Sequence, residues 1–282
     1  MPEATDYKQA AIEQWTADPC GANTVGGEPG SAQYFKRLLA ARDDYAPWMA
    51  DALDYAGACG LDVLDVGCGQ GIDLYQYARA GARATGVDLT PRHVELARAH
   101  LEAMGLGAEV VGGDAEHLPF DDATFHRASS NGVLHHTPDM PAALREVRRV
   151  LVPGGEARIV VYNRNSLHYW LTQVLLNGIG RGWLFRERSM AGVLSRGVEY
   201  SSVDARPLVR VYTARQLRSL MADAGFSDVG VTIRHFRAVD TPLTYPLRRL
   251  RLLQEPVVLD RIGRVGGWYI VAKGTATAEV RP

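Results

Sequence analysis

Three glycines at alternate positions, Gly67, Gly69 and Gly71, follow the strand-like segment 63–66. Glycine has no Cβ, so the backbone of such a turn can lie directly against a ligand. An acid, Asp88, ends the next apolar segment 17 residues after the last glycine. There its carboxylate can accept hydrogen bonds from both hydroxyls of a ribose. This spacing predicts a site for an adenosine-containing cofactor.

A second acid, Asp65, stands two residues before the first glycine. A dinucleotide site has the pattern G-x-G-x-x-G and places a pyrophosphate on a helix N-terminus. The pattern here is G-x-G-x-G, and a carboxylate at position 65 would repel a pyrophosphate. It suits the amino and sulfonium groups of S-adenosylmethionine (SAM), either by direct contact or by holding the loop. We therefore expect SAM as the cofactor and S-adenosylhomocysteine as its product.

Histidines follow two later segments of the chain: His135 and His136 come after 125–130, and His168 comes after 156–162. Methyl transfer is an in-line displacement, so an enzyme mainly aligns the reactants. A histidine can also take a proton from an acceptor, because its unperturbed pKa is about 6.5. Adjacent helical residues point about 100° apart, so one of the pair is expected to face the cofactor. The alternative is that both pack against the following turn.

Alternating strands and helices must position these residues. Strands are expected at 62–66, 83–88, 108–112, 125–130, 156–162, 228–234 and 267–273, and helices at 71–80, 91–104, 139–149 and 213–224. Such alternation predicts a parallel sheet covered by helices. Residues 5–17 and 32–56 also read as helical, with a break or kink at Pro47.

Residues 163–211 interrupt the alternation after the fifth strand, where an open α/β sheet has its ligand crevice. The segment is apolar and aromatic near its start, so we expect a lid that encloses an acceptor. Tyr162, Tyr169 and, from the N-terminal helix, Trp15 are candidate acceptor contacts. The alternative is that these aromatic side chains only pack within the protein.

Five segments resemble the class I SAM-dependent methyltransferases of the ubiquinone- and menaquinone-biosynthesis type, which act on small molecules. They are LDVLDVGCGQG (61–71), TGVDLTP (85–91), GGDAEHLPF (112–120), SSNGVLHHTPD (129–139) and RRVLVPGGEARIV (148–160). The resemblance implies an α/β fold with a Rossmann-like, seven-stranded, mostly parallel sheet. Helices cover both faces, an N-terminal helical extension precedes the sheet, and a lid is inserted after strand 5.

The same resemblance implies roles for single residues. Cofactor contacts are expected at Asp65, Gly67, Gly69, Gly71, Asp88, Leu89, Asp114, Ala115, Asn131 and Tyr34. Of these, Asp114 and Ala115 would hold the adenine, and Asn131 would lie beside the methionine part. Relatives with a Leu-His pair favour His135 as the base, ahead of His136 and His168.

Four parts of the chain follow from these patterns. They are an N-terminal helical extension over the cofactor site (1–58), a SAM-binding core (59–162), a lid or substrate cap (163–211) and the C-terminal part of the sheet with an Arg- and Pro-rich excursion (212–282).

Composition limits the partners. A net charge of −1 argues against a general nucleic-acid binder. Cysteines 20, 59 and 68 have neither C-x-x-C nor zinc spacing, so we expect no metal site and reduced thiols in the cytoplasm. The chain lacks an apolar run of about 20 residues, so no membrane insertion is expected. A homodimer is compatible with the sequence.

We therefore expect a SAM-dependent methyltransferase for a small-molecule acceptor, in specialised or quinone-like metabolism. Oxygen is the favoured acceptor atom, and nitrogen or carbon remain open. The alternatives are a SAM-binding cyclase or lyase and a non-catalytic SAM-binding regulatory subunit. The glycine spacing and the segments DAEHLPF and LVPGG disfavour an NAD-dependent dehydrogenase.

Overall fold

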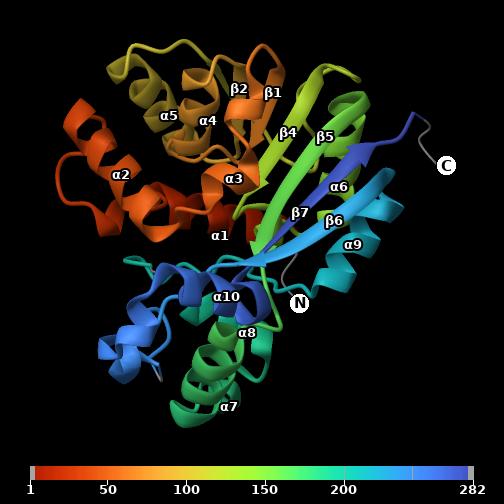
Figure 1. Cartoon of the computed structure of the whole chain (residues 1–282). Helices are drawn as coiled ribbons and strands as arrows, with labels where there is room; N and C mark the ends of the chain where they lie inside the picture. Colours follow the sequence, from red (N-terminus) through yellow and green to blue (C-terminus); the bar gives the residue numbers. More distant parts are fainter. Residues whose placement is uncertain (1–3, 200, 243, 279–282) are drawn as a thin grey trace.

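The computed structural model describes residues 4–199, 201–242 and 244–278. A seven-stranded sheet lies at its centre, in the order β3-β2-β1-β4-β5-β7-β6. The strands are β1 (Asp62–Val66), β2 (Arg83–Asp88), β3 (Glu109–Gly112), β4 (Phe125–Asn131), β5 (Leu151–Tyr162), β6 (Phe226–Arg234) and β7 (Tyr269–Ala276). Strands β1 to β5 pair in parallel, and β7 is antiparallel to both neighbours (Figure 1). The predicted mostly parallel seven-stranded sheet is confirmed.

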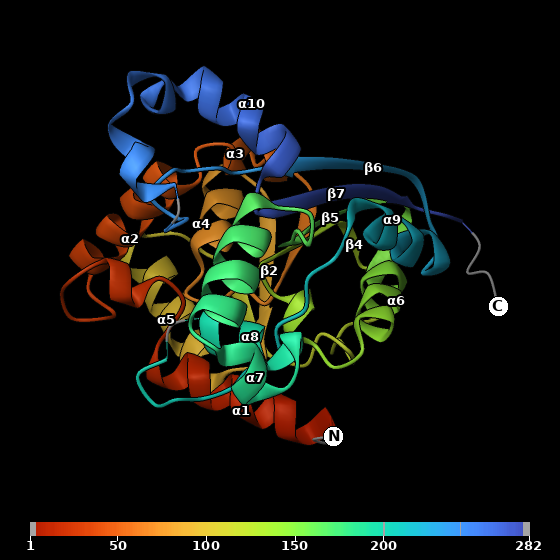
Figure 2. The ribbon, with the colours of Figure 1, turned by 90° about the horizontal axis from the view of Figure 1, so that it is seen from below.

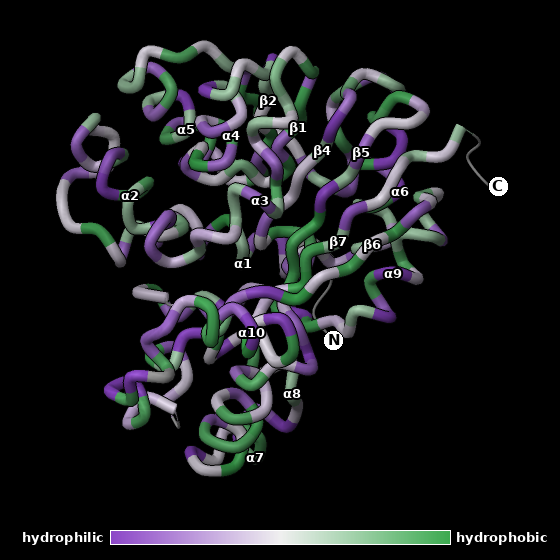
Figure 3. The backbone as a smooth tube through the Cα atoms, viewed as in Figure 1, coloured by the Kyte–Doolittle hydropathy of each residue, from purple (hydrophilic) through white to green (hydrophobic). Residues whose placement is uncertain are grey.

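Helices cover both faces of the sheet (Figure 2). On one face α4 (Ile72–Arg79) and α5 (Pro91–Ala103) pack over Val63 and Val160. On the other, α6 (Met140–Val150) and α9 (Ala214–Asp223) pack over Leu64 and Val161. Neighbouring residues of one strand enter opposite cores because side chains alternate along a strand. This double coverage explains the apolar stretches of β5 and β7 in Figure 3.

The N-terminal part contains α1 (Ala4–Ala17), α2 (Ala32–Tyr45) and α3 (Met49–Leu53), with short 3-10 turns at η1 (Ala22–Thr24) and η2 (Ala56–Ala58). Ser31 caps α2 by accepting from the Tyr34 N–H at 3.2 Å. The break predicted at Pro47 separates α2 from α3, because proline cannot donate the next helical hydrogen bond.

Strand β5 begins at Leu151, five residues before the predicted start at 156. Leu151 pairs with Phe125, and regular pairing resumes only where Glu156 meets Arg127. The Pro-Gly-Gly stretch therefore lies in an irregular part of the β4–β5 pairing, which the predicted strand 156–162 did not include.

Two helical excursions lie below the sheet in Figure 1. The first holds the π-helix η4 (His168–Gly180), α7 (Trp183–Glu187) and α8 (Met190–Gly197), and it falls in the segment expected to be a lid. The second, between β6 and β7, holds η5 (Tyr245–Arg249), η6 (Arg251–Gln254) and α10 (Pro256–Gly266). Among the described helices, none has the length and apolar character to cross a membrane.

Candidate active site

A cavity lies at the carboxyl ends of β1, β2 and β4. The sequence-predicted residues that line it are Trp15, Gly67, Gly69, Asp88, Leu89, Asp114, Ala115, Asn131, His136 and Tyr162. Lys8 and Trp15, both on α1, also line it, so α1 forms part of the cavity wall together with the glycine turn. The structure therefore brings most of the predicted cofactor contacts around one space.

Asp88 anchors the glycine turn. Its Oδ2 accepts from the Gly69 N–H at 2.8 Å, and its Oδ1 accepts from the Thr90 N–H at 2.9 Å. Burial alone would raise the pKa of Asp88, but hydrogen bonds from His93, Thr90 and Gly69 lower this pKa overall. The carboxylate is therefore ionised, and its Oδ2 keeps a lone pair for a ribose hydroxyl.

Lys8 closes the end of the cavity where the adenine is expected. Its Nζ lies 2.6 Å from Asp114 Oδ2 and 2.5 Å from Glu116 Oε2. Burial would lower the pKa of Lys8, but the two carboxylates raise it overall. The Lys8 ion pairs hold α1 against this part of the cavity. An adenine amino group would donate to the same Asp114 carboxylate that Lys8 contacts. Sequence reasoning missed Lys8, which has no local pattern to mark it.

Asp73, which also lines the cavity, accepts hydrogen bonds or an ion pair from three side chains. Its carboxylate lies 3.3 Å from Arg42 Nη2 and accepts from Tyr55 Oη at 2.7 Å and Asn131 Nδ2 at 2.8 Å. Arg42, Asp73 and Asn131 all line the cavity. Sequence reasoning missed Asp73, although an acid two residues after the last glycine, in the first turn of a helix, is a usable signal.

Asp65 lies behind this cavity and does not line it as the described residues form it. It is 2% exposed, and Ser129 Oγ donates to its Oδ1 at 3.3 Å. Its Oδ2 has no hydrogen-bond partner among the described residues. Burial, with the nearby Asp73 carboxylate, raises the pKa of Asp65 well above its usual range.

The raised pKa of Asp65 predicts a stability cost at neutral pH. Between the unfolded pKa, about 3.9, and the higher folded pKa, the folded state binds more protons, so stability falls as pH rises. Each pKa unit of elevation costs about 1.4 kcal/mol. Asp65→Asn, which mimics the neutral carboxyl, should therefore gain stability over wild type as pH rises from about 3.9 toward the raised folded pKa. Urea unfolding measures this gain, and parallel pH curves for the two proteins would contradict it.

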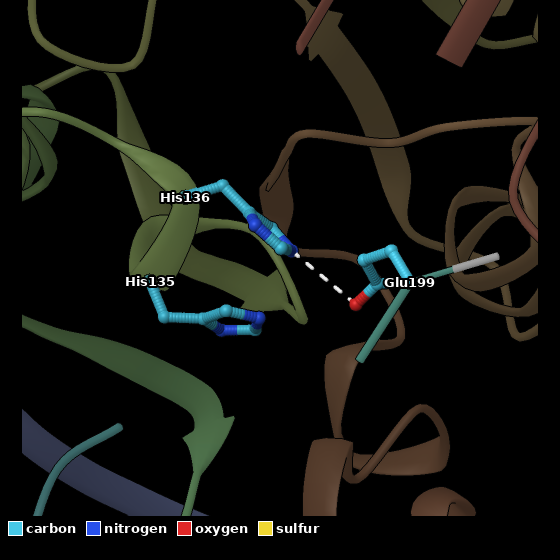
Figure 4. Close-up of side chains that lie close together, drawn as sticks. All are labelled: His135, His136 and Glu199. Carbon is cyan, nitrogen blue, oxygen red and sulfur yellow. Dashed lines mark ion pairs between the residues drawn. The ribbon is translucent and has the colours of Figure 1, made fainter. Parts of the chain in front are cut away.

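His136, and not His135, lines the cavity. Its Nδ1 donates to the Leu208 carbonyl at 2.6 Å, and its Nε2 lies 3.8 Å from Glu199 Oε1 (Figure 4). Burial lowers the pKa of His136 despite the opposing effect of Glu199. His135 is fully buried, and burial with the neighbouring His136 holds its pKa well below the usual range. Both imidazoles are therefore neutral, and of the two predicted bases only His136 has a ring that lines the cavity.

Tyr162, at the end of β5, donates its hydroxyl to Glu199 Oε1 at 2.7 Å. Glu199 follows α8 and lines the cavity, so the lid segment contributes a carboxylate to it. Sequence reasoning missed Glu199, because 63 residues separate it from His136 and no local motif surrounds it.

A second cavity of about 580 Å³ adjoins the first. Both cavities are lined by Cys20, Arg42, Tyr45, Ile72, Tyr162, Glu199 and Tyr269. His168 lines the second one, but its Nδ1 donates to the Asp240 carbonyl at 3.1 Å and its Nε2 faces the Gln173 amide at 3.1 Å. Both ring nitrogens of His168 are thus engaged, unlike Nε2 of His136.

Three further predicted residues lie outside both cavities as the described residues form them. Tyr34 is buried behind the glycine turn and donates to Gln70 Oε1 at 2.9 Å. Gly71, at φ 77°, packs against α5, where an added Cβ would lie 3.2 Å from Ala97. Tyr169 packs in an apolar cluster with Leu194. Each supports an element that borders the site.

Comparison with known proteins agrees with this geometry. A family model described as a methyltransferase domain matches residues 63–155. The ubiquinone biosynthesis O-methyltransferase of Xanthomonas oryzae pv. oryzae is 30% identical over 182 residues, which cover 64% of this chain and 72% of that relative. The enzyme of the same name from Methylocella silvestris is 32% identical over 166 residues, which cover 56% of this chain and 62% of the relative. The chain thus spans less than two thirds of this second relative.

A solved structure shows the same fold. In the complex of the Haloferax volcanii Trm112 methyltransferase activator with a methyltransferase, one chain superposes with a TM-score of 0.57 at 20% identity. The match covers 94% of this chain and 97% of that one. Taken with the sheet order and the relative covered over 72% of its length, these matches show that the chain belongs to the class I SAM-dependent methyltransferases.

Proposed function

We propose that this protein transfers the methyl group of SAM to a small-molecule acceptor and releases S-adenosylhomocysteine. The observation that carries the proposal is the junction of two cavities at Tyr162, Glu199 and Tyr269. A cofactor in the first cavity would face an acceptor in the second across these side chains. In-line displacement needs such an arrangement, with the reacting atoms about 3–3.5 Å apart.

The cofactor would lie along the carboxyl ends of the parallel strands. Asp88 would hold the ribose, Asp114 and Ala115 the adenine, and Gly67 and Gly69 would let the backbone approach the methionine part. The Asp73 carboxylate lines the same cavity and would attract the positively charged amino group of the cofactor.

The second cavity suits an aromatic or partly apolar acceptor. Its volume of about 580 Å³ is typical of a small-molecule site. Aromatic side chains that line it include Tyr45, Tyr162, Phe236, Trp268 and Tyr269. An oxygen acceptor is favoured, in line with the O-methyltransferases among the relatives, and nitrogen and carbon acceptors are the alternatives. The proposed setting is the cytoplasm, without nucleic acid as a partner.

The proposal predicts turnover that a labelled cofactor can follow. Incubation with methyl-labelled SAM and a panel of phenols and hydroquinones should yield S-adenosylhomocysteine and a methylated phenol in equal amounts, as measured by mass spectrometry. Asp88→Ala should lose this turnover because the cofactor is no longer held. A rearranged product without label would indicate a cyclase or lyase. SAM binding without turnover on any acceptor would favour a regulatory subunit.

A further inference from the structure

The geometry points to a divalent transition-metal site formed by His135, His136 and Glu199 beside the cofactor cavity. The two histidines come from the 3-10 turn η3 (Leu134–His136), and Glu199 comes from the lid segment after α8. One ligand atom of each residue lies within 4.8 Å of the others. Figure 4 shows the His136 ring directed at the Glu199 carboxylate and the His135 ring beside it. The spacing of the chain's histidines and acids did not predict this grouping, because Glu199 reaches it only through the fold.

His135 supplies the first independent argument. The side chain is 0% exposed, yet neither ring nitrogen has a hydrogen-bond partner among the described residues. A buried polar group without a partner costs about 1–3 kcal/mol, so native proteins rarely keep one. A metal ion bound to one ring nitrogen would satisfy one of these two atoms.

The tautomer of His136 supplies the second argument. Because Nδ1 donates to the Leu208 carbonyl, the lone pair of Nε2 faces the Glu199 carboxylate at 3.8 Å. Two electron-rich atoms at this distance are too far apart for a hydrogen bond and leave room for a cation. Metal-binding histidines commonly donate their other N–H to a carbonyl in this way, which orients the ring.

The surroundings of Glu199 complete the donor set. The Tyr162 hydroxyl donates to Glu199 Oε1 at 2.7 Å, which is the kind of outer hydrogen bond that orients a ligating carboxylate. Two histidines and one glutamate bind catalytic zinc and leave a further position open. His136 and Glu199 line the cofactor cavity, and Glu199 also lines the second cavity, so this open position would face the acceptor.

The proposal of a metal site depends only on these contacts. A role of the metal in catalysis depends in addition on the proposed function. An acceptor hydroxyl bound to the metal would lose its proton to solvent more readily, because the cation stabilises the alkoxide or phenoxide. That oxygen would then bond to the methyl carbon while the carbon–sulfur bond breaks. The sulfur keeps the bonding electron pair, so the sulfonium becomes a neutral thioether.

Metal titration of the full chain tests the site. After treatment with a chelator, the protein should bind one equivalent of zinc by calorimetry, and cobalt should give the visible absorption of a protein-bound ion. Glu199→Gln should weaken zinc binding by about 10- to 100-fold. Its side chain is only partly buried and lies on the lid segment, so this variant keeps the core that His135→Ala could disturb. His126→Ala removes a half-exposed histidine outside both cavities and should bind zinc as wild type does.

Equal zinc affinity in wild type and Glu199→Gln would overturn the metal site, as would an equal loss in His126→Ala. Titration of the wild type with S-adenosylhomocysteine separates this result from the proposed function. Binding of that nucleoside without one equivalent of zinc would overturn the metal site only. Zinc binding without nucleoside binding would overturn the cofactor assignment and leave the metal site in place.

Discussion

Replacing Asp88 with alanine is expected to lower the affinity for S-adenosylhomocysteine by about 100- to 1,000-fold. Hydrogen bonds to a charged group are worth about 1.5–3 kcal/mol each, and a ribose can make two to this carboxylate. The substitution also removes the acceptor of the Gly69 N–H, which holds the glycine turn against β2. Calorimetric titration measures the loss directly.

A matched control for Asp88→Ala is Asp122→Ala. The Asp122 side chain is 78% exposed and pairs with Arg149 outside both cavities. This variant should bind the nucleoside with wild-type affinity. Thermal unfolding of both variants checks that they are folded. Wild-type affinity in folded Asp88→Ala would mean that the ribose lies elsewhere, and binding of NAD alone would contradict the cofactor assignment.

Local spacing predicted a group of residues that line one cavity. Asp88 ends β2, while the glycine turn, Asp114 and Ala115 follow strands within a few residues, and parallel strands bring their carboxyl ends to one edge of the sheet. The order of apolar segments was therefore enough to predict that these residues share a cavity.

The residues that sequence reasoning missed come from distant elements. Lys8 and Arg42 lie on the N-terminal helices, and Glu199 lies beyond the π-helix η4. The positions of these three side chains depend on how the helices pack against the sheet. The spacing of residues along the sequence does not predict that packing. Such contacts depend on tertiary packing and are visible only in the folded chain.

The histidine pair shows a different limit. Side-chain divergence predicted that one histidine would face the cofactor, and His136 alone lines the cavity. Resemblance favoured His135 instead, which is fully buried and does not line the cavity. The pair lies in a short 3-10 turn, where side-chain directions differ from those of an α-helix. The local backbone, which the sequence did not reveal, thus decides which of the two rings lines the cavity.

Arg42→Ala is expected to reduce the free energy of unfolding by about 3 kcal/mol, because it removes one partner of a buried ion pair. Arg42 Nη2 lies 3.3 Å from Asp73 Oδ2, and these side chains are 22% and 10% exposed. The pKa of Asp65 is already raised by burial and by Asp73, and Arg42 opposes this rise. Without Arg42, the Asp65 and Asp73 carboxyls would lose the guanidinium that opposes their mutual repulsion. Thermal unfolding should show a fall of about 5 °C in Tm.

Ligand rescue distinguishes this electrostatic cause from simple loss of packing. The amino group of S-adenosylhomocysteine would bring a positive charge beside Asp73, so this ligand should restore more stability to Arg42→Ala than adenosine, which lacks that group. Arg264→Ala is the control, since its exposed pair with Asp260 on α10 should contribute no measurable stability. Equal rescue by the two nucleosides would show that the amino group does not lie at Asp73. Rescue by S-adenosylhomocysteine alone would place the methionine end of the cofactor beside Asp73, next to the cavity proposed for the acceptor.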